Sequence, residues 1–140
     1  MAKAILAPGA VLILWTLIML VWMAATRGAA VRELAPATLK VGARSSDLDG
    51  VIADRINWKA HNYEHLLEQP TIFYATVFIL AFGGFTALDV VMAWAYVSLR
   101  VVHSIWQATA NRQPVRVMLF LLSSIPLFAL AIRAALMVLL

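Results

Sequence analysis

Arg100 and His103 lie one helical turn apart inside a long apolar stretch of the sequence. An arginine at membrane depth costs about 3 kcal/mol, so its presence there marks a candidate functional site. Gln107 follows at the seventh position after Arg100, which places all three side chains on one stripe of a helix. The spacing therefore predicts that Arg100, His103 and Gln107 line one buried polar cavity.

A second polar cluster leads directly into another apolar stretch. Its ionisable members are spaced i, i+3, i+4 and i+7, again on one stripe of a helix: His61, Glu64, His65 and Glu68. Two polar stripes on facing helices would satisfy each other inside a membrane protein. The same pattern also allows a purely structural interpretation, in which Glu64 or Glu68 neutralises Arg100 and holds the helices together.

The cluster contains a second possible chemistry. His61-x-x-Glu64-His65 matches the inverted zincin motif, in which two histidines bind zinc and a glutamate acts as base. Glu68, Asp54 or a residue of another helix would supply the third ligand, and the zinc would activate a water for hydrolysis. We prefer an interpretation without metal, because two histidines among nine polar positions arise readily without one. A membrane zinc hydrolase is the alternative.

The elements that position these residues are predicted from composition and apolar length. Of the 140 residues, 64% are hydrophobic and 13% are charged, which excludes a soluble protein. A membrane-spanning helix needs about 20 apolar residues, so the chain has room for four and for little else. We predict an all-α integral membrane four-helix bundle, a single domain over residues 1–140, with spans at residues 4–26, 54–83, 86–109 and 115–139.

The connections between the spans are predicted from turn residues and charge. Residues 27–53 form the one substantial polar loop, which we expect to be irregular, and Gly83-Gly84 makes a tight connection. Pro114 breaks the chain before the fourth span, where a helix start tolerates it. Lysines and arginines concentrate around the first and third connections, which the positive-inside rule places in the cytoplasm, with both termini outside and the site facing the cytoplasm.

Charge and cysteine content limit the function further. The net charge of +4 is explained by membrane topology and requires no nucleic-acid partner. The chain has no cysteine, so it offers no disulfide, thiol nucleophile or thiolate metal ligand. Any sulfur chemistry must use the sulfur of a substrate.

Several motifs together resemble one membrane family over essentially the whole chain. They are a charged first connection, a polar entrance to the second helix that closes on Glu68-Gln69-Pro70, the stripe Arg100-Val101-Val102-His103, and the run Asn111-Arg112-Gln113-Pro114-Val115-Arg116. The sequence is similar to the MAPEG proteins, the membrane-associated proteins in eicosanoid and glutathione metabolism. Residues 100–116 resemble the microsomal prostaglandin E synthase and glutathione transferase branch in particular.

The resemblance implies a homotrimer that binds glutathione between neighbouring subunits, open to the cytoplasm. At matching positions, Arg100 and His103 would help hold glutathione, Arg112 would lie near one of its carboxylates, and Arg116 would face its thiol. Gln107 stands at the position of a family aromatic residue, and Val117 stands where the prostaglandin branch has a serine.

The family pattern Arg-x-x-x-Asn-x-x-Glu of the second helix fits this sequence in two registers. Alignment on Asn62 leaves His65 at the glutamate position. Alignment on Glu68 puts His65 at the asparagine position and His61 at the arginine position. Both registers remain open, so Asn62, His65 and Glu68 are all candidate glutathione ligands.

These residue types suit glutathione, which carries two carboxylates and an ammonium group. Arg100, Arg112 and Lys59 are suitable partners for the carboxylates, and Glu68 for the ammonium. Arg116 would stabilise the thiolate, which then attacks a lipophilic small molecule that arrives through the membrane lipids. The resemblance thus implies a transferase or peroxidase with glutathione as cosubstrate. The alternative outside the enzymes is a MAPEG member that binds lipid or acts as a scaffold without catalysis.

Overall fold

The computed structural model describes residues 2–35, 38–39 and 41–140, and within these it contains helices and no strands. Four helices are long and apolar enough to cross a membrane. This supports a multi-pass, all-helical membrane protein. In chain order the elements are α1 (Lys3–Arg32), the short 3-10 helix η1 (Ser45–Leu48), α2 (Asp54–Gly83), α3 (Ala87–Thr109) and α4 (Gln113–Leu139).

The connection between α1 and α2 differs from its prediction as an irregular loop. Helix α1 continues to Arg32, six residues past the predicted end of the first span, and η1 forms a turn at Ser45–Leu48. Arg27 explains part of the difference, because its guanidinium donates to Ser45 Oγ at 2.6 Å and to Asn57 Oδ1 at 2.8 Å. These bonds fasten the last turns of α1 to the connection and to α2. Pro36, Ala37 and Lys40 lie outside the described residues.

The two shorter connections follow the chemistry of their turn residues. Gly84 has φ +121°, a conformation that only glycine adopts without strain, and it ends α2. Helix α3 then begins with a reciprocal cap, in which Asp89 N donates to Thr86 Oγ1 and Thr86 N donates to the Asp89 carboxylate. Pro114 lies in the first turn of α4, as predicted.

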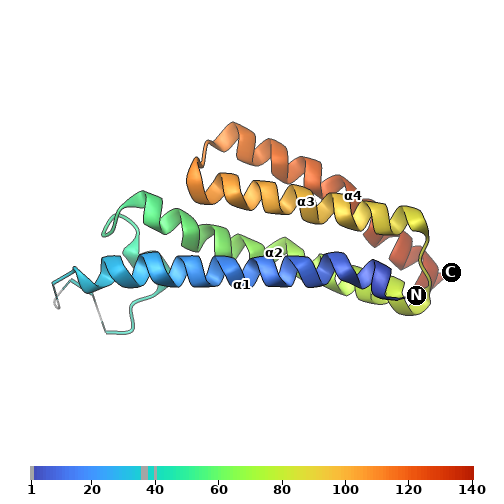
Figure 1. The fold of residues 1–140 in the computed structure, drawn as a ribbon, viewed down its shortest axis with the longest axis horizontal. Coiled ribbons are helices and arrows are strands. Elements are labelled where there is room, and N and C mark those ends of the chain that lie inside the picture. Colours follow the sequence, from blue (N-terminus) through green and yellow to red (C-terminus); the bar gives the residue numbers. More distant parts are fainter. Residues whose placement is uncertain (1, 36–37, 40) are drawn as a thin grey trace.

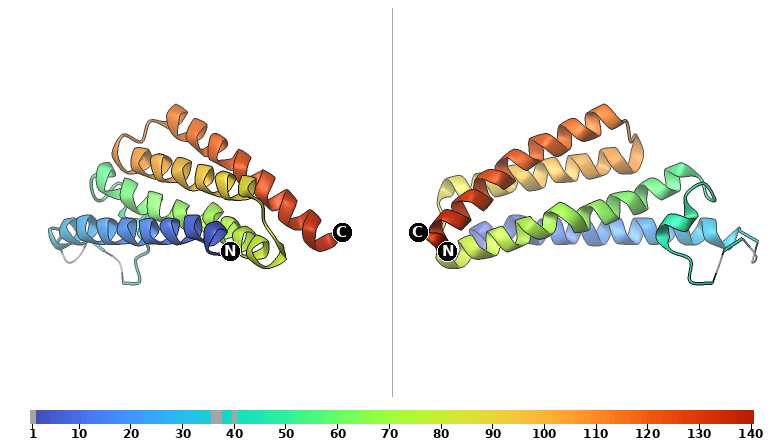
Figure 2. Two further views of the ribbon diagram at one scale, coloured as in Figure 1. Left: turned by 45° about the vertical axis from the view of Figure 1, so that its right-hand side comes forward. Right: turned by 180° about the vertical axis from the view of Figure 1, so that it is seen from behind.

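The helices are arranged so that one end of the bundle carries the polar connections. Both termini and the turn between α2 and α3 lie at one end, and the connections α1–α2 and α3–α4 lie at the other (Figures 1 and 2). Helix α1 packs along α2, and α3 packs along α4. We call the end with the α1–α2 and α3–α4 connections the loop end.

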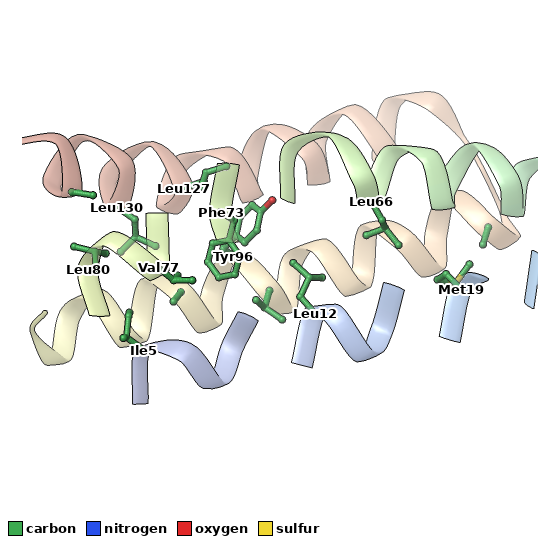
Figure 3. Packing of buried hydrophobic residues seen from close by; sticks show 14 residues of the cluster. Ile5, Leu12, Met19, Leu66, Phe73, Val77, Leu80, Tyr96, Leu127 and Leu130 are labelled. Atoms are coloured by element: carbon green, nitrogen blue, oxygen red, sulfur yellow. The ribbon is translucent and has the colours of Figure 1, made fainter. Parts of the chain in front are cut away.

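The apolar core follows two stripes with a spacing of seven residues. Ile5, Leu12 and Met19 of α1 are fully buried, and so is a matching series on α2, formed by Leu66, Phe73 and Leu80. A seven-residue spacing keeps side chains on one face of a helix, so the two stripes can pack against each other (Figure 3). Phe73 also meets Tyr96 of α3, with ring centroids 4.5 Å apart. This core fixes α2 and α3 relative to each other.

Arg133 fastens α4 to α3 near the end that carries the termini. Its Nε lies 2.7 Å from Oδ1 of Asp89, whose side chain is 2% exposed. Arg133 is therefore the charged partner of a buried carboxylate.

Arg133→Ala should therefore destabilise the protein, by about 1–3 kcal/mol, because it leaves the Asp89 carboxylate buried without its partner. Thermal unfolding in detergent measures the effect. The double variant Asp89→Asn with Arg133→Ala should recover part of the loss. Equal stability of Arg133→Ala and the wild type would contradict this role.

Candidate functional site

A cavity of about 260 Å³ lies between α2, α3 and α4. Helix α2 contributes one lining residue, α3 two and α4 three: His65, His103, Gln107, Arg116, Val117 and Phe120. We call this cavity the α2–α4 pocket. Its lining is formed by the polar stripe of α3, the histidine face of α2 and the first two turns of α4. The cavity is lined by His103 and Gln107 of the predicted stripe, whereas Arg100 is not among its lining residues.

Three aromatic rings form one wall of the α2–α4 pocket. The rings of His65 and His103 lie 5.0 Å apart between centroids, and Phe120 lies 5.5 Å from the first and 6.4 Å from the second. His103 comes from α3 and is almost completely buried, whereas His65 of α2 is partly exposed. The wall thus combines imidazole nitrogens with an apolar face.

Arg100 lies directly beside this wall and is fully buried. Its Nη2 donates to the backbone oxygen of His65 at 3.0 Å and lies 3.4 Å from His65 Nδ1. Its Nε and Nη1 have no hydrogen-bond partner among the described residues. A buried guanidinium with two unpartnered nitrogens, which carry three N–H groups, is costly, and an anionic ligand that accepts from them would remove that cost.

No described carboxylate neutralises Arg100. Glu64 instead accepts a hydrogen bond from Ser45 Oγ at 2.6 Å, and the Glu68 side chain is 69% exposed. Glu68 comes closest to His65, at 3.9 Å between Oε2 and Nε2. The structural interpretation, in which Glu64 or Glu68 pairs with Arg100, therefore does not describe this protomer.

Arg116 brings a second guanidinium to the α2–α4 pocket from the first turn of α4. Its Nη1 donates to Oδ1 of Asn111 at 2.9 Å. Gln107 adds an acceptor, since its Oε1 is buried without a partner among the described residues. The pocket lining thus contains one guanidinium group, an amide oxygen and two imidazoles but no carboxylate, and the guanidinium of Arg100 lies beside it. These groups suit a ligand that carries negative charge and at least one N–H group.

Comparison with known proteins identifies the family. The model of the MAPEG family matches residues 5–136, which include nearly all of the four long helices. The chain belongs to the MAPEG family. No curated protein and no solved structure matches it.

The site residues predicted for this MAPEG protein fall into two groups. Four gather at the α2–α4 pocket: His65, His103, Gln107 and Arg116. Arg100 adjoins them through its contact with His65. In this protomer the other four are engaged elsewhere or face outward: Lys59, Asn62, Glu68 and Arg112.

Each residue of the second group has a local reason for its position. Lys59 lies over the ring of Trp22 on α1, 5.5 Å from its centroid. Asn62 is fully buried and donates to Ser104 Oγ at 2.8 Å, which joins α2 to α3. Arg112 is exposed and caps the start of α4, where its backbone oxygen accepts from Trp106 Nε1.

The inverted zincin motif does not converge in the structure. His61 Nε2 lies 3.1 Å from Oδ1 of Asp49, whereas His65 turns towards Arg100. No group of three or more histidine, aspartate and glutamate side chains within the described residues is placed to hold a metal ion. The geometry therefore gives the zinc alternative no support.

Sequence reasoning missed one pocket residue, Phe120, and the role of Asn111, which contacts the pocket residue Arg116. Phe120 follows Arg116 by one helical turn, which was a sufficient signal to place both on one face of α4. Asn111 was noted as part of a family run without a role. Helices often end with a glycine or asparagine in the left-handed backbone conformation. The backbone conformation of Asn111 was therefore predictable from the sequence, but its hydrogen bond to Arg116 was not.

Proposed function

We propose that this MAPEG protein is a membrane-bound, glutathione-dependent transferase or peroxidase that adds a glutathione thiolate to lipophilic electrophiles. The observation that carries the proposal is the fully buried Arg100, whose Nε and Nη1 have no partner, beside a pocket that also contains Arg116. Family membership is consistent with this activity. The resemblance to the prostaglandin E synthase and glutathione transferase branch suggests which residue plays which role.

The two arginines have different roles in this proposal. Arg100 binds a carboxylate of glutathione through its free N–H groups, because a guanidinium matches a carboxylate in charge and geometry. Arg116 faces the thiol. A cysteine thiol has a pKa of about 8.5 and is only partly ionised at neutral pH, so a nearby cation increases the fraction of reactive thiolate.

The remaining pocket residues hold and orient the peptide. Gln107 Oε1 accepts from an amide or ammonium N–H, and His103 supplies a further hydrogen bond. Phe120 and Val117 present an apolar surface to the electrophile, which reaches the sulfur from the bilayer. In the transferase reaction the thiolate forms a bond to the electrophilic carbon and displaces its leaving group, such as the halide of an alkyl halide. In the peroxidase reaction the thiolate attacks the terminal peroxide oxygen and releases the alcohol, and a second glutathione converts the resulting sulfenic acid to the disulfide with release of water. Neither reaction requires a metal.

Two features of the single protomer support the proposed trimer: a pocket that is small for a ligand and an exposed carboxylate. Its pocket of about 260 Å³ is smaller than most ligand pockets, which measure roughly 300–1,000 Å³. Glu68, one turn from His65, has an exposed carboxylate that lipid would not solvate. A neighbouring subunit would cover Glu68 and add the missing wall of the pocket. Glutathione would contact Lys59, Asn62 and Arg112 only if the neighbouring subunit holds it against them.

Native mass spectrometry of the purified protein in detergent should therefore show a homotrimer as the main species, because pooling buried polar groups at subunit interfaces removes them from lipid. A stable monomer as the only species would contradict this assembly.

The orientation in the membrane is part of the proposal. The loop end carries the concentrations of lysine and arginine, so the positive-inside rule places it in the cytoplasm and both termini outside. The α2–α4 pocket lies towards the loop end, since Arg116 is in the first turn of α4 and Gln107 in the last turns of α3. Glutathione would enter from the cytoplasm.

A turnover assay tests the proposed function against a non-catalytic, lipid-binding role. The purified protein in lipid nanodiscs is mixed with glutathione and either a lipophilic alkyl halide or a lipophilic hydroperoxide. The proposal expects consumption of glutathione above the rate without protein with at least one of them. Tight binding of lipid anions with no turnover of either would support the scaffold alternative instead.

A further inference from the structure

We propose that Asn111 is a positioning residue that fixes the guanidinium of Arg116 at the α2–α4 pocket and thereby sets the ionisation of the reacting thiol. The inference rests on the proposed function, in which Arg116 faces that thiol. Its structural half, that Asn111 holds Arg116, is independent of the identity of the ligand.

The contact joins two elements at the loop end. Asn111 follows α3, and Arg116 lies in the first turn of α4. The amide oxygen of Asn111 accepts a hydrogen bond of 2.9 Å from Arg116 Nη1. Arg116 carries five N–H donors in a planar fork, so one bond to Nη1 restricts the plane of the group and leaves the other donors for a ligand.

The backbone of Asn111 has an uncommon conformation that asparagine tolerates. Its φ is +49°, and it is the one non-glycine residue with positive φ among the described residues. Glycine would adopt this conformation at lower cost, but it has no side chain with which to accept a bond from Arg116. Asparagine meets both needs of the position, the left-handed backbone and the acceptor.

The turn between α3 and α4, which contains Asn111, is stabilised by hydrogen bonds of Trp106. The backbone oxygen of Trp106 accepts from the N–H groups of Ala110 and Asn111, at 2.9 and 2.8 Å. The indole Nε1 of Trp106 donates to the backbone oxygen of Arg112 at 3.2 Å. The same Arg112 oxygen accepts from Arg116 N at 3.1 Å. The backbone on both sides of the Asn111–Arg116 contact is therefore fixed.

Arg116 needs such a partner because of its place on α4. The N-terminus of a helix carries a partial positive charge, which disfavours a cation in the first turn. No described carboxylate forms a salt bridge with Arg116. The neutral acceptor of Asn111 steadies the guanidinium without neutralising it, which leaves its full charge for the thiolate.

Two variants separate the acceptor from the backbone conformation. Asn111→Gly keeps the left-handed backbone and removes the acceptor, so the trimer should fold with unchanged thermal stability. Asn111→Asp keeps an acceptor and tolerance of the backbone, but its carboxylate would partly neutralise Arg116, so this variant is used only in the modification measurement. Gln113→Ala is the control, because Gln113 is an exposed neighbour in the same connection.

The first measurement is independent of glutathione. The ligand-free trimer is treated with an arginine-selective dicarbonyl, and mass spectrometry gives the modification rate of Arg116 relative to the exposed Arg32 of α1. Asn111→Gly should raise this ratio several-fold, and Asn111→Asp and Gln113→Ala should leave it near the wild-type value. An unchanged ratio in Asn111→Gly would overturn the inference whatever the ligand is.

The second measurement follows the ultraviolet absorbance of the thiolate of bound glutathione against pH. Loss of a positioned cation disfavours the thiolate, so Asn111→Gly should shift its ionisation to higher pH and lower turnover at neutral pH several-fold, with KM for glutathione nearly unchanged. Unaltered ionisation in a variant with a raised modification ratio would overturn the functional half of the inference. If the wild type binds no glutathione, the proposed function fails, and the modification ratio still decides whether Asn111 positions Arg116.

Discussion

Arg116→Ala should lower the rate of glutathione conjugation to a lipophilic electrophile by about 10²–10³-fold, because one well-placed donor at a developing charge contributes this much to catalysis. Glutathione affinity should change much less, since Arg100 lies beside the pocket and keeps the free N–H groups of its Nε and Nη1. The loss therefore falls on kcat more than on KM, which indicates an interaction made with the reacting state. Steady-state kinetics in nanodiscs, together with the thiolate absorbance of bound glutathione, measure both effects.

Arg32→Ala is the matched control for this experiment. It removes the same charge from an exposed position in the last turn of α1 and should leave turnover unchanged. Arg133→Ala is unsuitable as a control, because Arg133 pairs with the buried Asp89 and its loss affects the fold. Full turnover in Arg116→Ala with unaltered thiolate absorbance would remove Arg116 from the reaction.

Arg100→Met should change stability and binding in opposite directions. A buried cation without a carboxylate partner costs free energy in the ligand-free protein, so a methionine of similar volume should leave the free energy of unfolding unchanged or raise it by about 1–4 kcal/mol. Glutathione affinity should fall about 30-fold or more, since loss of one partner of a buried charge pair costs about 2–5 kcal/mol. Thermal unfolding and a binding titration on the same sample give both values.

Val102→Met is the control for the stability measurement, because it introduces methionine on an exposed face of the same helix. A purely structural Arg100 gives a different result. If Arg100→Met strongly destabilises the ligand-free protein and leaves glutathione affinity unchanged, Arg100 holds helices together and binds no ligand.

The bounds of the helices were predictable where turn or capping residues stand at their ends. The bounds of α2 and α3 agree with the predicted ranges to within one residue, because Gly83-Gly84 and Thr86 separate two apolar runs. The end of α1 was predicted six residues too early, since the prediction followed the loss of apolar character after Thr26. The bonds of Arg27 to Ser45 and Asn57 extend the helix, and they join residues far apart in the sequence.

The candidate site was predictable from helical spacing on α3 but only in part on α2. On α3, His103 and Gln107 line the α2–α4 pocket as the spacing predicted, whereas Arg100 lies beside the pocket and contacts His65. On α2, the direction of each side chain depends on how the helix is turned against α3, which spacing alone does not determine. Asn62 meets Ser104 and leaves only His65 of the family pattern at the pocket.

Residues from the connections could not be assigned from spacing. The partner of Glu64 is Ser45 in η1, and the partner of Arg116 is Asn111 after α3. Both contacts depend on the path of a loop or a turn between helices. The structural alternative, in which Glu64 or Glu68 neutralises Arg100, is not seen in this protomer, because Glu64 bonds to the connection between α1 and α2 and the Glu68 side chain is exposed.

Calorimetric titration of the wild-type protein with glutathione, with Arg100→Met as the matched variant, tests whether Arg100 binds glutathione. We expect one class of saturable sites in the wild type, with affinity in the range of cellular thiol, roughly millimolar or tighter, and a loss of about 30-fold or more in the variant. Absence of heat of binding in the folded wild-type protein, or equal affinity in the two proteins, would show that Arg100 binds no glutathione.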